Sequence, residues 1–166
     1  MSAEPVNGAP PLRVGIIGYG VMGKAHSYGY RVAPMLRPLP VTPVVTVMSG
    51  RHASAVAAAA ASYGVPATVT DWRELIARDD VDVVDICTPP GTHAEMARQA
   101  AAAGKAVLCE KPLALNYPEA AAARCCSATP GSTSCGTAAR TTTSACTACA
   151  GSARSIPRTL SLIHIS

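Results

Sequence analysis

Aromatic residues are scarce in this chain of 166 residues: phenylalanine is absent, tryptophan occurs once and tyrosine five times. The basic residues are not clustered and no aromatic side chains are interleaved with them, so the sequence does not indicate a nucleic-acid-binding surface. No apolar run reaches the roughly 18–20 residues that a membrane-spanning helix requires. Alanine, with 32 residues, is the largest contributor to the hydrophobic fraction of 49%. A core of alanine, valine, isoleucine and leucine suits the close packing of helices on a sheet.

The N-terminal segment lacks a basic region followed by an apolar one, which is the pattern of a secretory signal. We therefore expect a cytoplasmic protein without a disulfide framework, in which residues 1–11 are a disordered lead-in. The seven cysteines and four histidines show no convincing zinc-ligand spacing. Cys146 and Cys149 form a CxxC pair, but no second pair and no histidine lie near it. The sequence therefore predicts no metal site.

Acidic residues are absent from the last quarter of the chain. Residues 125–166 contain three arginines, five of the seven cysteines and no aspartate or glutamate, so they carry +3 of the net charge of +4. Serine and threonine make up 14 of the 35 residues in 125–159, and such a composition is typical of disorder. We expect residues 124–166 to be an anomalous tail translated after a frameshift, with an end at 160–166 that resembles a translated sequencing adapter. The alternative is a natural tail with an apolar terminus.

Strand-like and helix-like segments alternate between residues 12 and 123. Runs of apolar and β-branched residues predict strands, and caps followed by alanine-rich segments predict helices. The predicted strands are residues 12–18, 44–48, 66–70, 81–87 and 106–109; the predicted helices are 21–35, 54–63, 71–78 and 92–104, with another starting at Asn116. Thr92 and Glu95 have the spacing of a capping box. The alternation predicts an α/β fold for residues 12–123, a Rossmann-type doubly wound parallel sheet.

A glycine turn follows the first predicted strand and opens the first predicted helix, which is the context that the dinucleotide-binding fingerprint requires. Gly18 permits the tight turn, Gly20 lets a pyrophosphate approach the backbone, and Gly23 lets the helix pack close to the strand. The free N–H groups at the helix start attract phosphates. The predicted cofactor-binding residues of this turn are Gly18, Tyr19, Gly20, Val21, Met22 and Gly23. The alternative is a structural turn that binds no ligand.

The end of the second predicted strand, residues 48–52, contains no acidic residue. An acid there would bind the ribose 2′-hydroxyl of NAD, whereas an arginine accommodates the 2′-phosphate of NADP. We therefore expect NADP to be preferred over NAD, with Ser49 and Arg51 at the 2′-phosphate. The alternative is that Arg51 is a solvated residue at a helix start.

Two later stretches carry a family resemblance. Residues 85–93 read Asp-Ile-Cys-Thr-Pro-Pro-Gly-Thr-His, and residues 104–114 read Gly-Lys-Ala-Val-Leu-Cys-Glu-Lys-Pro-Leu-Ala. Together with the glycine turn, they resemble the Gfo/Idh/MocA family, to which glucose–fructose oxidoreductase and inositol dehydrogenase belong. The resemblance runs from Leu12 to Ala123. Its most specific signal is the Glu-Lys-Pro sequence at residues 110–112, at the end of one predicted strand. It follows the Thr-Pro sequence at residues 88–89, at the end of the preceding predicted strand.

The resemblance implies an NAD(P)-dependent oxidoreductase that acts on the CH–OH group of a sugar, cyclitol or related polyol. It places Thr88, Pro89 and His93 beside the cofactor and Glu110 and Lys111 near the nicotinamide. Lys111 is the predicted catalytic residue, which contacts cofactor and substrate and assists proton movement. Family members carry a second α/β domain that supplies most of the substrate pocket. We therefore expect this fragment to be inactive alone and its parent to form a homo-oligomer through that domain.

Other interpretations stay open. A non-catalytic regulatory or redox-sensing module that binds NAD(P) would contain the same glycine turn. Glu110 has the alternative role of orienting Lys111. His26 is expected to be an ordinary helix histidine and Trp72 a packing residue. The two strand-end cysteines are expected to be small buried apolar residues; they are Cys87 and Cys109.

Overall fold

The computed structural model describes residues 10–127 of the chain. The expected lead-in and tail lie almost wholly outside these residues, as do Cys146 and Cys149. Among the described helices, none has the length and apolar character needed to cross a membrane.

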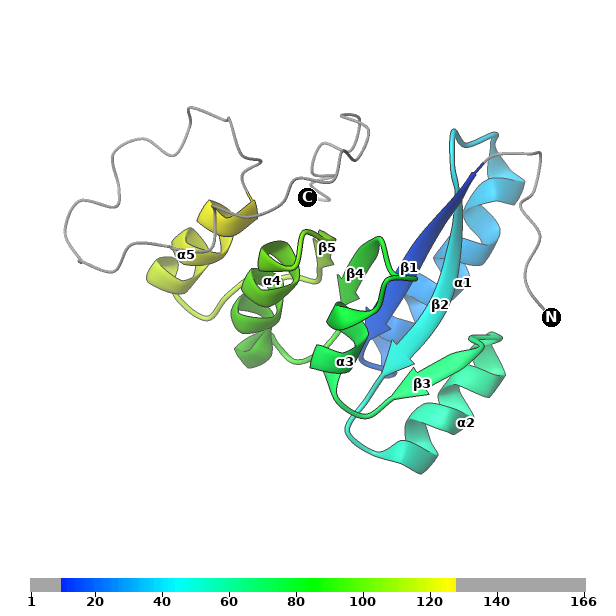
Figure 1. The fold of residues 1–166 in the computed structure, drawn as a ribbon, viewed down its shortest axis with the longest axis horizontal. Helices are drawn as coiled ribbons and strands as arrows, with labels where there is room; N and C mark the ends of the chain where they lie inside the picture. Colours follow the sequence, from blue (N-terminus) through cyan, green and yellow to red (C-terminus); the bar gives the residue numbers. More distant parts are fainter. Residues whose placement is uncertain (1–9, 128–166) are drawn as a thin grey trace.

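Five parallel strands form one sheet in the order β3-β2-β1-β4-β5 (Figure 1). The strands are β1 (Pro11–Ile17), β2 (Thr42–Ser49), β3 (Ala67–Val69), β4 (Val83–Ile86) and β5 (Ala106–Cys109). The helices are α1 (Val21–Leu36), α2 (Ala53–Tyr63), α3 (Trp72–Ala77), α4 (His93–Ala102) and α5 (Tyr117–Ser127), with a 3-10 turn, η2 (Pro90–Thr92), before α4. The predicted Rossmann-type fold is therefore confirmed, and each predicted strand and helix is present with ends shifted by a few residues.

Two apolar clusters cover the two faces of the sheet. On one face, Ile17 of β1 and Val84 of β4 pack with α3 and α4. On the other face, Ile16 of β1 and Met48 of β2 pack with α2. Neighbouring residues on a strand point to opposite faces, so the apolar runs of β1 and β2 supply both clusters. Trp72 packs against the first cluster, as expected.

The helix starts agree only partly with the sequence pattern. The Asp71 side chain accepts a hydrogen bond from the Arg73 N–H, and the Asn116 side chain accepts one from the Glu119 N–H, so both act as caps. The predicted capping box of Thr92 and Glu95 is wrong. Thr92 is the N-cap residue of α4 but makes no side-chain cap bond. Its Oγ1 donates to the Pro89 carbonyl oxygen instead, because η2 turns the chain just before α4.

Leu75 of α3 is the residue chosen to test the packing of the first cluster, because its side chain is fully buried and lies against Gly15 of β1. We expect Leu75→Ala to lower the free energy of unfolding by about 2–5 kcal/mol, since the lost side chain leaves a cavity under the sheet. The control is Leu36→Ala at the exposed end of α1, where we expect a change within about 0.5 kcal/mol. Urea unfolding of the 166-residue chain measures both, and equal effects would contradict this packing.

Candidate cofactor-binding site

The carboxyl ends of four strands are level at one edge of the sheet. Ile17 of β1 pairs with Ser49 of β2 and with Ile86 of β4, and Ile86 pairs with Cys109 of β5. The residues that follow these strands therefore meet along this edge. The chain runs outward from β1 through β2 to β3 and then continues on the other side of β1 with β4 and β5 (Figure 1). Ligands of such sheets bind outside the strand ends at this reversal, here between β1 and β4.

The glycine turn lies between the ends of β2 and β4. The Gly18 N–H donates to the Ser49 carbonyl oxygen at 2.9 Å, and Gly18 has a φ of 107°, a conformation that favours glycine. A Cβ atom on Gly18 would lie 2.8 Å from the Cys87 carbonyl oxygen. A Cβ atom on Gly23 would overlap the Gly18 carbonyl oxygen. The backbone of α1 therefore sits directly on the turn.

The start of α1 offers unused donors. Gly20 is its exposed N-cap residue, and open space surrounds the position of a Cβ atom there. The first helical hydrogen bond runs from the Lys24 N–H to the Gly20 carbonyl oxygen. Val21 and Met22 are exposed, no side chain caps the helix, and its first turn contains no acid. This uncapped helix start fits the pyrophosphate of a dinucleotide.

Tyr19 and Arg51 stand at the end of β2. The Tyr19 ring covers Gly50, where a Cβ atom would overlap the ring. Arg51 is exposed. Ser49, in contrast, exposes only 1% of its surface. Of the two residues expected at the 2′-phosphate, only Arg51 therefore presents its side chain to solvent, because Ser49 is the last residue of a strand covered on both faces.

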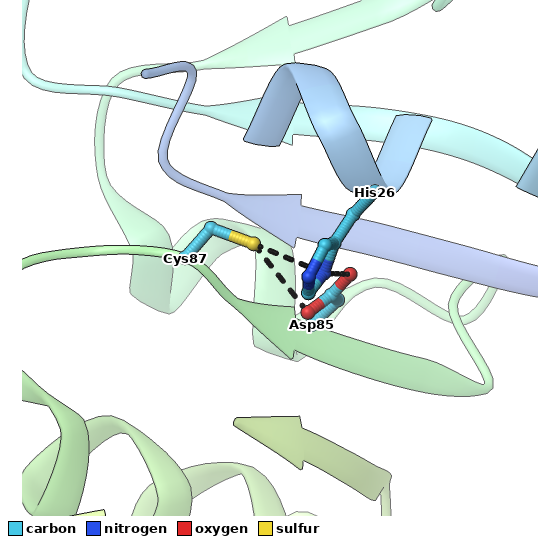
Figure 2. Close-up of side chains that lie close together, drawn as sticks. All are labelled: His26, Asp85 and Cys87. Atoms are coloured by element: carbon cyan, nitrogen blue, oxygen red, sulfur yellow. Dashed lines mark hydrogen bonds and ion pairs between the residues drawn. The ribbon is translucent and has the colours of Figure 1, made fainter. Parts of the chain in front are cut away.

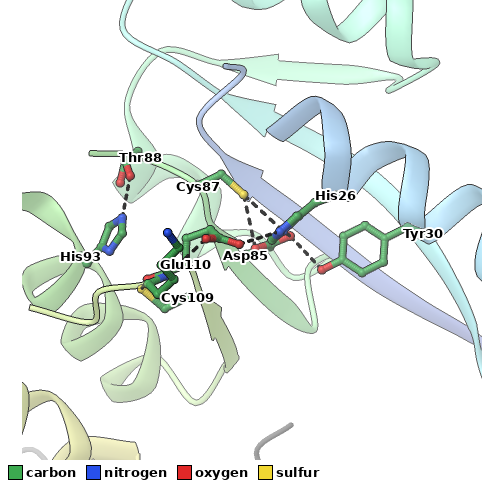
Figure 3. Close-up of polar contacts among 9 residues, drawn as sticks. His26, Tyr30, Asp85, Cys87, Thr88, His93, Cys109 and Glu110 are labelled. Atoms are coloured by element: carbon green, nitrogen blue, oxygen red, sulfur yellow. Dashed lines mark hydrogen bonds and ion pairs between the residues drawn. The ribbon is translucent and has the colours of Figure 1, made fainter. Parts of the chain in front are cut away.

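The loop after β4 contains Thr88 and Pro89 at the same edge. Thr88 Oγ1 is hydrogen-bonded to Thr92 Oγ1 at 2.7 Å. His93, which the resemblance places beside the cofactor, exposes only 1% of its surface. Its Nε2 lies 2.6 Å from the Thr88 carbonyl oxygen (Figure 3), and its Nδ1 lies 2.9 Å from the Pro112 carbonyl oxygen. His93 thus joins the loops after β4 and β5.

Glu110 and Lys111 follow β5. The Glu110 N–H donates to the Ile86 carbonyl oxygen at 3.0 Å, which continues the strand pairing, and the Lys111 N–H donates to Glu110 Oε2 at 3.3 Å. The Glu110 side chain is mostly buried, whereas Lys111 is exposed. Lys111 is therefore free to meet a ligand at this edge while Glu110 holds its main chain.

The structure corrects the expectation that His26 is an ordinary helix histidine. His26 Nδ1 lies 2.8 Å from Asp85 Oδ2 (Figure 2), and His26 Nε2 lies 3.0 Å from Glu110 Oε1 (Figure 3). The Tyr30 hydroxyl donates to the same Asp85 oxygen at 2.8 Å. Two sequence signals could have found this group: Asp85 is an acid inside an apolar strand, and His26 and Tyr30 are four residues apart on one helix face.

Burial and the neighbouring carboxyl groups shift the pKa values of the histidine, the tyrosine and the cysteines around Asp85. The hydrogen bond to Asp85 raises the pKa of His26 more than desolvation lowers it, and Glu110 raises it further. Protonated imidazole donates from both nitrogens, which matches its two carboxylate partners. Burial, together with Asp85, raises the pKa of Tyr30 and of the Cys87 thiol, and raises that of Cys109 to about 12.

Three side chains of this group have metal-ligating atoms within 4.8 Å of one another: His26, Asp85 and Cys87 (Figure 2). The arrangement fits a hydrogen-bonded network better than a metal centre. His26 Nδ1 and Asp85 Oδ2 are hydrogen-bonded directly to each other, with no space for an ion between these two atoms.

Comparison with known proteins gives one family. Residues 12–129 match the Gfo/Idh/MocA model, described as an oxidoreductase family with an NAD-binding Rossmann fold. A levoglucosan dehydrogenase of Pseudarthrobacter phenanthrenivorans is 46% identical over 112 residues, which cover 67% of this chain and 29% of that protein. An inositol 2-dehydrogenase of Rhizobium meliloti is 34% identical over 105 residues, covering 63% and 29%.

A solved structure shows the same likeness. The complex of a levoglucosan dehydrogenase with NADH and levoglucosan has a TM-score of 0.69 and 44% identity, and the match covers 70% of this chain and 32% of that one. The chain thus spans about a third of the length of the relatives it matches.

The two helix glycines of α1 form a matched pair for the glycine turn. We expect Gly23→Ala to weaken NADH binding at least about tenfold and to destabilise the fold by about 1–3 kcal/mol, because its methyl group overlaps the Gly18 carbonyl oxygen. Gly29 has open space around it, so Gly29→Ala should stabilise the helix by about 0.5–1 kcal/mol and leave binding unchanged. Calorimetry and urea unfolding measure these effects. NADH binding by Gly23→Ala equal to that of the wild type would refute the close contact.

The His26 network predicts a pH-dependent stability. The folded pKa of His26 is raised above its ordinary 6.5, so the stability it contributes is complete below pH 6.5 and is lost as the pH rises through the folded pKa. We expect the difference in unfolding free energy between wild type and His26→Gln to shrink as the pH rises above about 6.5. The control is His52→Gln at the exposed start of α2, whose difference should not follow this course. A His26→Gln difference that grows with pH would contradict the bridge.

Proposed function

The chain belongs to the Gfo/Idh/MocA oxidoreductase family, and we propose that it binds NADP(H) in preference to NAD(H) for hydride transfer at the CH–OH group of a sugar, cyclitol or related polyol. The observation that carries the proposal is the open glycine turn at the strand reversal. Gly18 and Gly23 allow α1 to start directly on the turn, and Gly20 leaves space above it. A bound dinucleotide pyrophosphate would meet the free N–H groups of Val21 and Met22.

The preference for NADP rests on the end of β2. No acid stands at residues 48–52 to bind a ribose 2′-hydroxyl, and the exposed Arg51 supplies a positive charge for a 2′-phosphate. The solved levoglucosan dehydrogenase complex contains NADH, so NAD(H) remains the second cofactor of the proposal. Tyr19, which covers Gly50, would flank the same ribose.

The proposed chemistry is that of a nicotinamide, which accepts or gives a hydride when bound. Lys111 is exposed beyond the end of β5, and we assign it the substrate hydroxyl. In its neutral form the Lys111 amine would accept the hydroxyl proton as the hydride leaves and the carbinol carbon becomes a carbonyl carbon; the ammonium so formed would return that proton in the reverse direction. Thr88 and Pro89, in the loop after the neighbouring strand β4, would border the nicotinamide side.

Polyol oxidation is proposed for a longer protein that contains this domain, since the matched residues cover only 29% of the length of either relative. We propose a cytoplasmic homo-oligomer whose additional domain completes the substrate pocket. The boundary at residue 123 and the frameshift origin of residues 124–166 also remain proposals. Both α5 and the family match continue past that boundary, to residues 127 and 129. Resequencing the gene beyond codon 124 tests the frameshift.

Arg51 provides the test of cofactor preference. We expect the 166-residue chain to bind NADPH more tightly than NADH, and Arg51→Ala to weaken NADPH binding about tenfold while NADH binding stays the same, because only NADPH carries the 2′-phosphate. The control is Arg37→Ala at the far end of α1, which should change neither affinity. Calorimetry measures the NADPH and NADH affinities of all three proteins. A wild type that prefers NADH would reject the Arg51 assignment, and binding of neither nucleotide would reject the glycine-turn site.

A further inference from the structure

We propose that His26 is a positioning residue that ties the Glu110–Lys111 strand end to the helix of the glycine turn, so that the pyrophosphate and nicotinamide halves of the site keep a fixed separation. The bridge itself stands on the geometry of the described residues. Its consequence for a cofactor rests on the proposed function, in which Lys111 meets the nicotinamide and the substrate.

The bridge connects three elements that are distant in sequence. His26 lies one helical turn after Gly23, the residue that seats α1 on the turn. Its two ring nitrogens contact Asp85 on β4 and Glu110 after β5, at 2.8 and 3.0 Å (Figure 3). The imidazole is therefore a rigid link, with one carboxylate at each end, between the phosphate-binding helix and the strand end that carries Lys111.

Asp85 is the fixed end of this link. It is fully buried, and a buried carboxylate is costly unless charged or hydrogen-bonding partners surround it. Its Oδ2 receives both His26 and the Tyr30 hydroxyl, and the Cys87 thiol lies 3.5 Å from its Oδ1. These contacts fix the imidazole plane and aim Nε2 at Glu110, as a carboxylate orients a histidine in other sites.

Glu110 is the end of this link that contacts the main chain of Lys111. One carboxylate oxygen contacts His26 and the other accepts the Lys111 N–H at 3.3 Å. Losing His26 Nε2 would free the Glu110 side chain and, with it, the main chain of Lys111. The two cysteines near the network stay neutral at ordinary pH, because burial and the carboxylates raise the pKa of both thiols. His26 is thus the base whose two ring nitrogens face the two carboxyl groups.

Two substitutions separate positioning from packing. The amide nitrogen of His26→Asn takes the place of Nδ1 and keeps a donor for Asp85, whereas that of His26→Gln reaches the place of Nε2 and keeps a donor for Glu110. The probes are NADPH and 2′-phospho-ADP-ribose, which lacks only the nicotinamide. In the 166-residue chain, we expect His26→Asn to weaken NADPH about tenfold and 2′-phospho-ADP-ribose less than about twofold, and His26→Gln to keep NADPH within about threefold of wild type.

If His26 only packs against its neighbours, both variants should weaken the binding of both nucleotides by the same factor. That result overturns the proposal. Glu110→Gln is the second variant, because it alters the same contact without touching α1. It should also weaken NADPH selectively, and His26→Asn/Glu110→Gln should bind NADPH no more weakly than the weaker single variant, since both remove one contact. Additive losses overturn the bridge.

A measurement on the chain without nucleotide tests the bridge independently of the proposed function. We expect His26→Asn to shift the backbone amide resonances of Lys111 and Leu113, and His52→Asn at the exposed start of α2 to leave them in place. If these resonances shift but the wild type binds neither nucleotide, the bridge holds and the proposed function fails. If the wild type binds NADPH and neither the resonances nor the nucleotide selectivity respond to His26→Asn, the bridge is rejected.

Discussion

The close packing of Gly23 against the Gly18 carbonyl oxygen sets the position of α1. The position of α1 in turn determines the geometry of the candidate site. A side chain at either glycine would meet backbone atoms, of Gly18 in one case and of Cys87 in the other, so the approach is possible only without Cβ atoms. Because backbone atoms cannot yield as a flexible side chain can, the helix has one place to start. From that start, the helical repeat carries His26 and Tyr30 to Asp85 one and two turns later.

The two faces of the sheet are stabilised in different ways near this edge. The face under α3 and α4 is apolar throughout its cluster. The face under α1 contains the buried Asp85, whose desolvation is offset by a histidine and a tyrosine from one helix. A purely apolar contact would tolerate small rotations of α1, whereas these directed hydrogen bonds select one orientation of the helix.

The level strand ends explain how residues from separate parts of the chain form one site. The register aligns the ends of β1, β2, β4 and β5, so the glycine turn, Arg51, the Thr88 loop and Lys111 follow them along one edge. His93 and His26 then tie neighbouring segments together, His93 between two loops and His26 between α1 and the end of β5. The two histidines link these segments, His93 through backbone carbonyl oxygens and His26 through side-chain carboxyl groups, while Arg51 and Lys111 stay exposed at this edge.

The sequence by itself determined the features that depend on near neighbours in the chain. Strand runs, the glycine turn, the caps at Asp71 and Asn116, and the family motifs follow from residues within a few positions of one another. Only the tertiary structure decided that Ser49 and His93 are buried, that η2 replaces a capping box at Thr92, and that His26 joins Asp85 and Glu110. His26 is separated from those two partners by 59 and 84 residues. Such contacts depend on sheet order and strand register, and no local pattern of residues encodes which strand end a helix histidine will face.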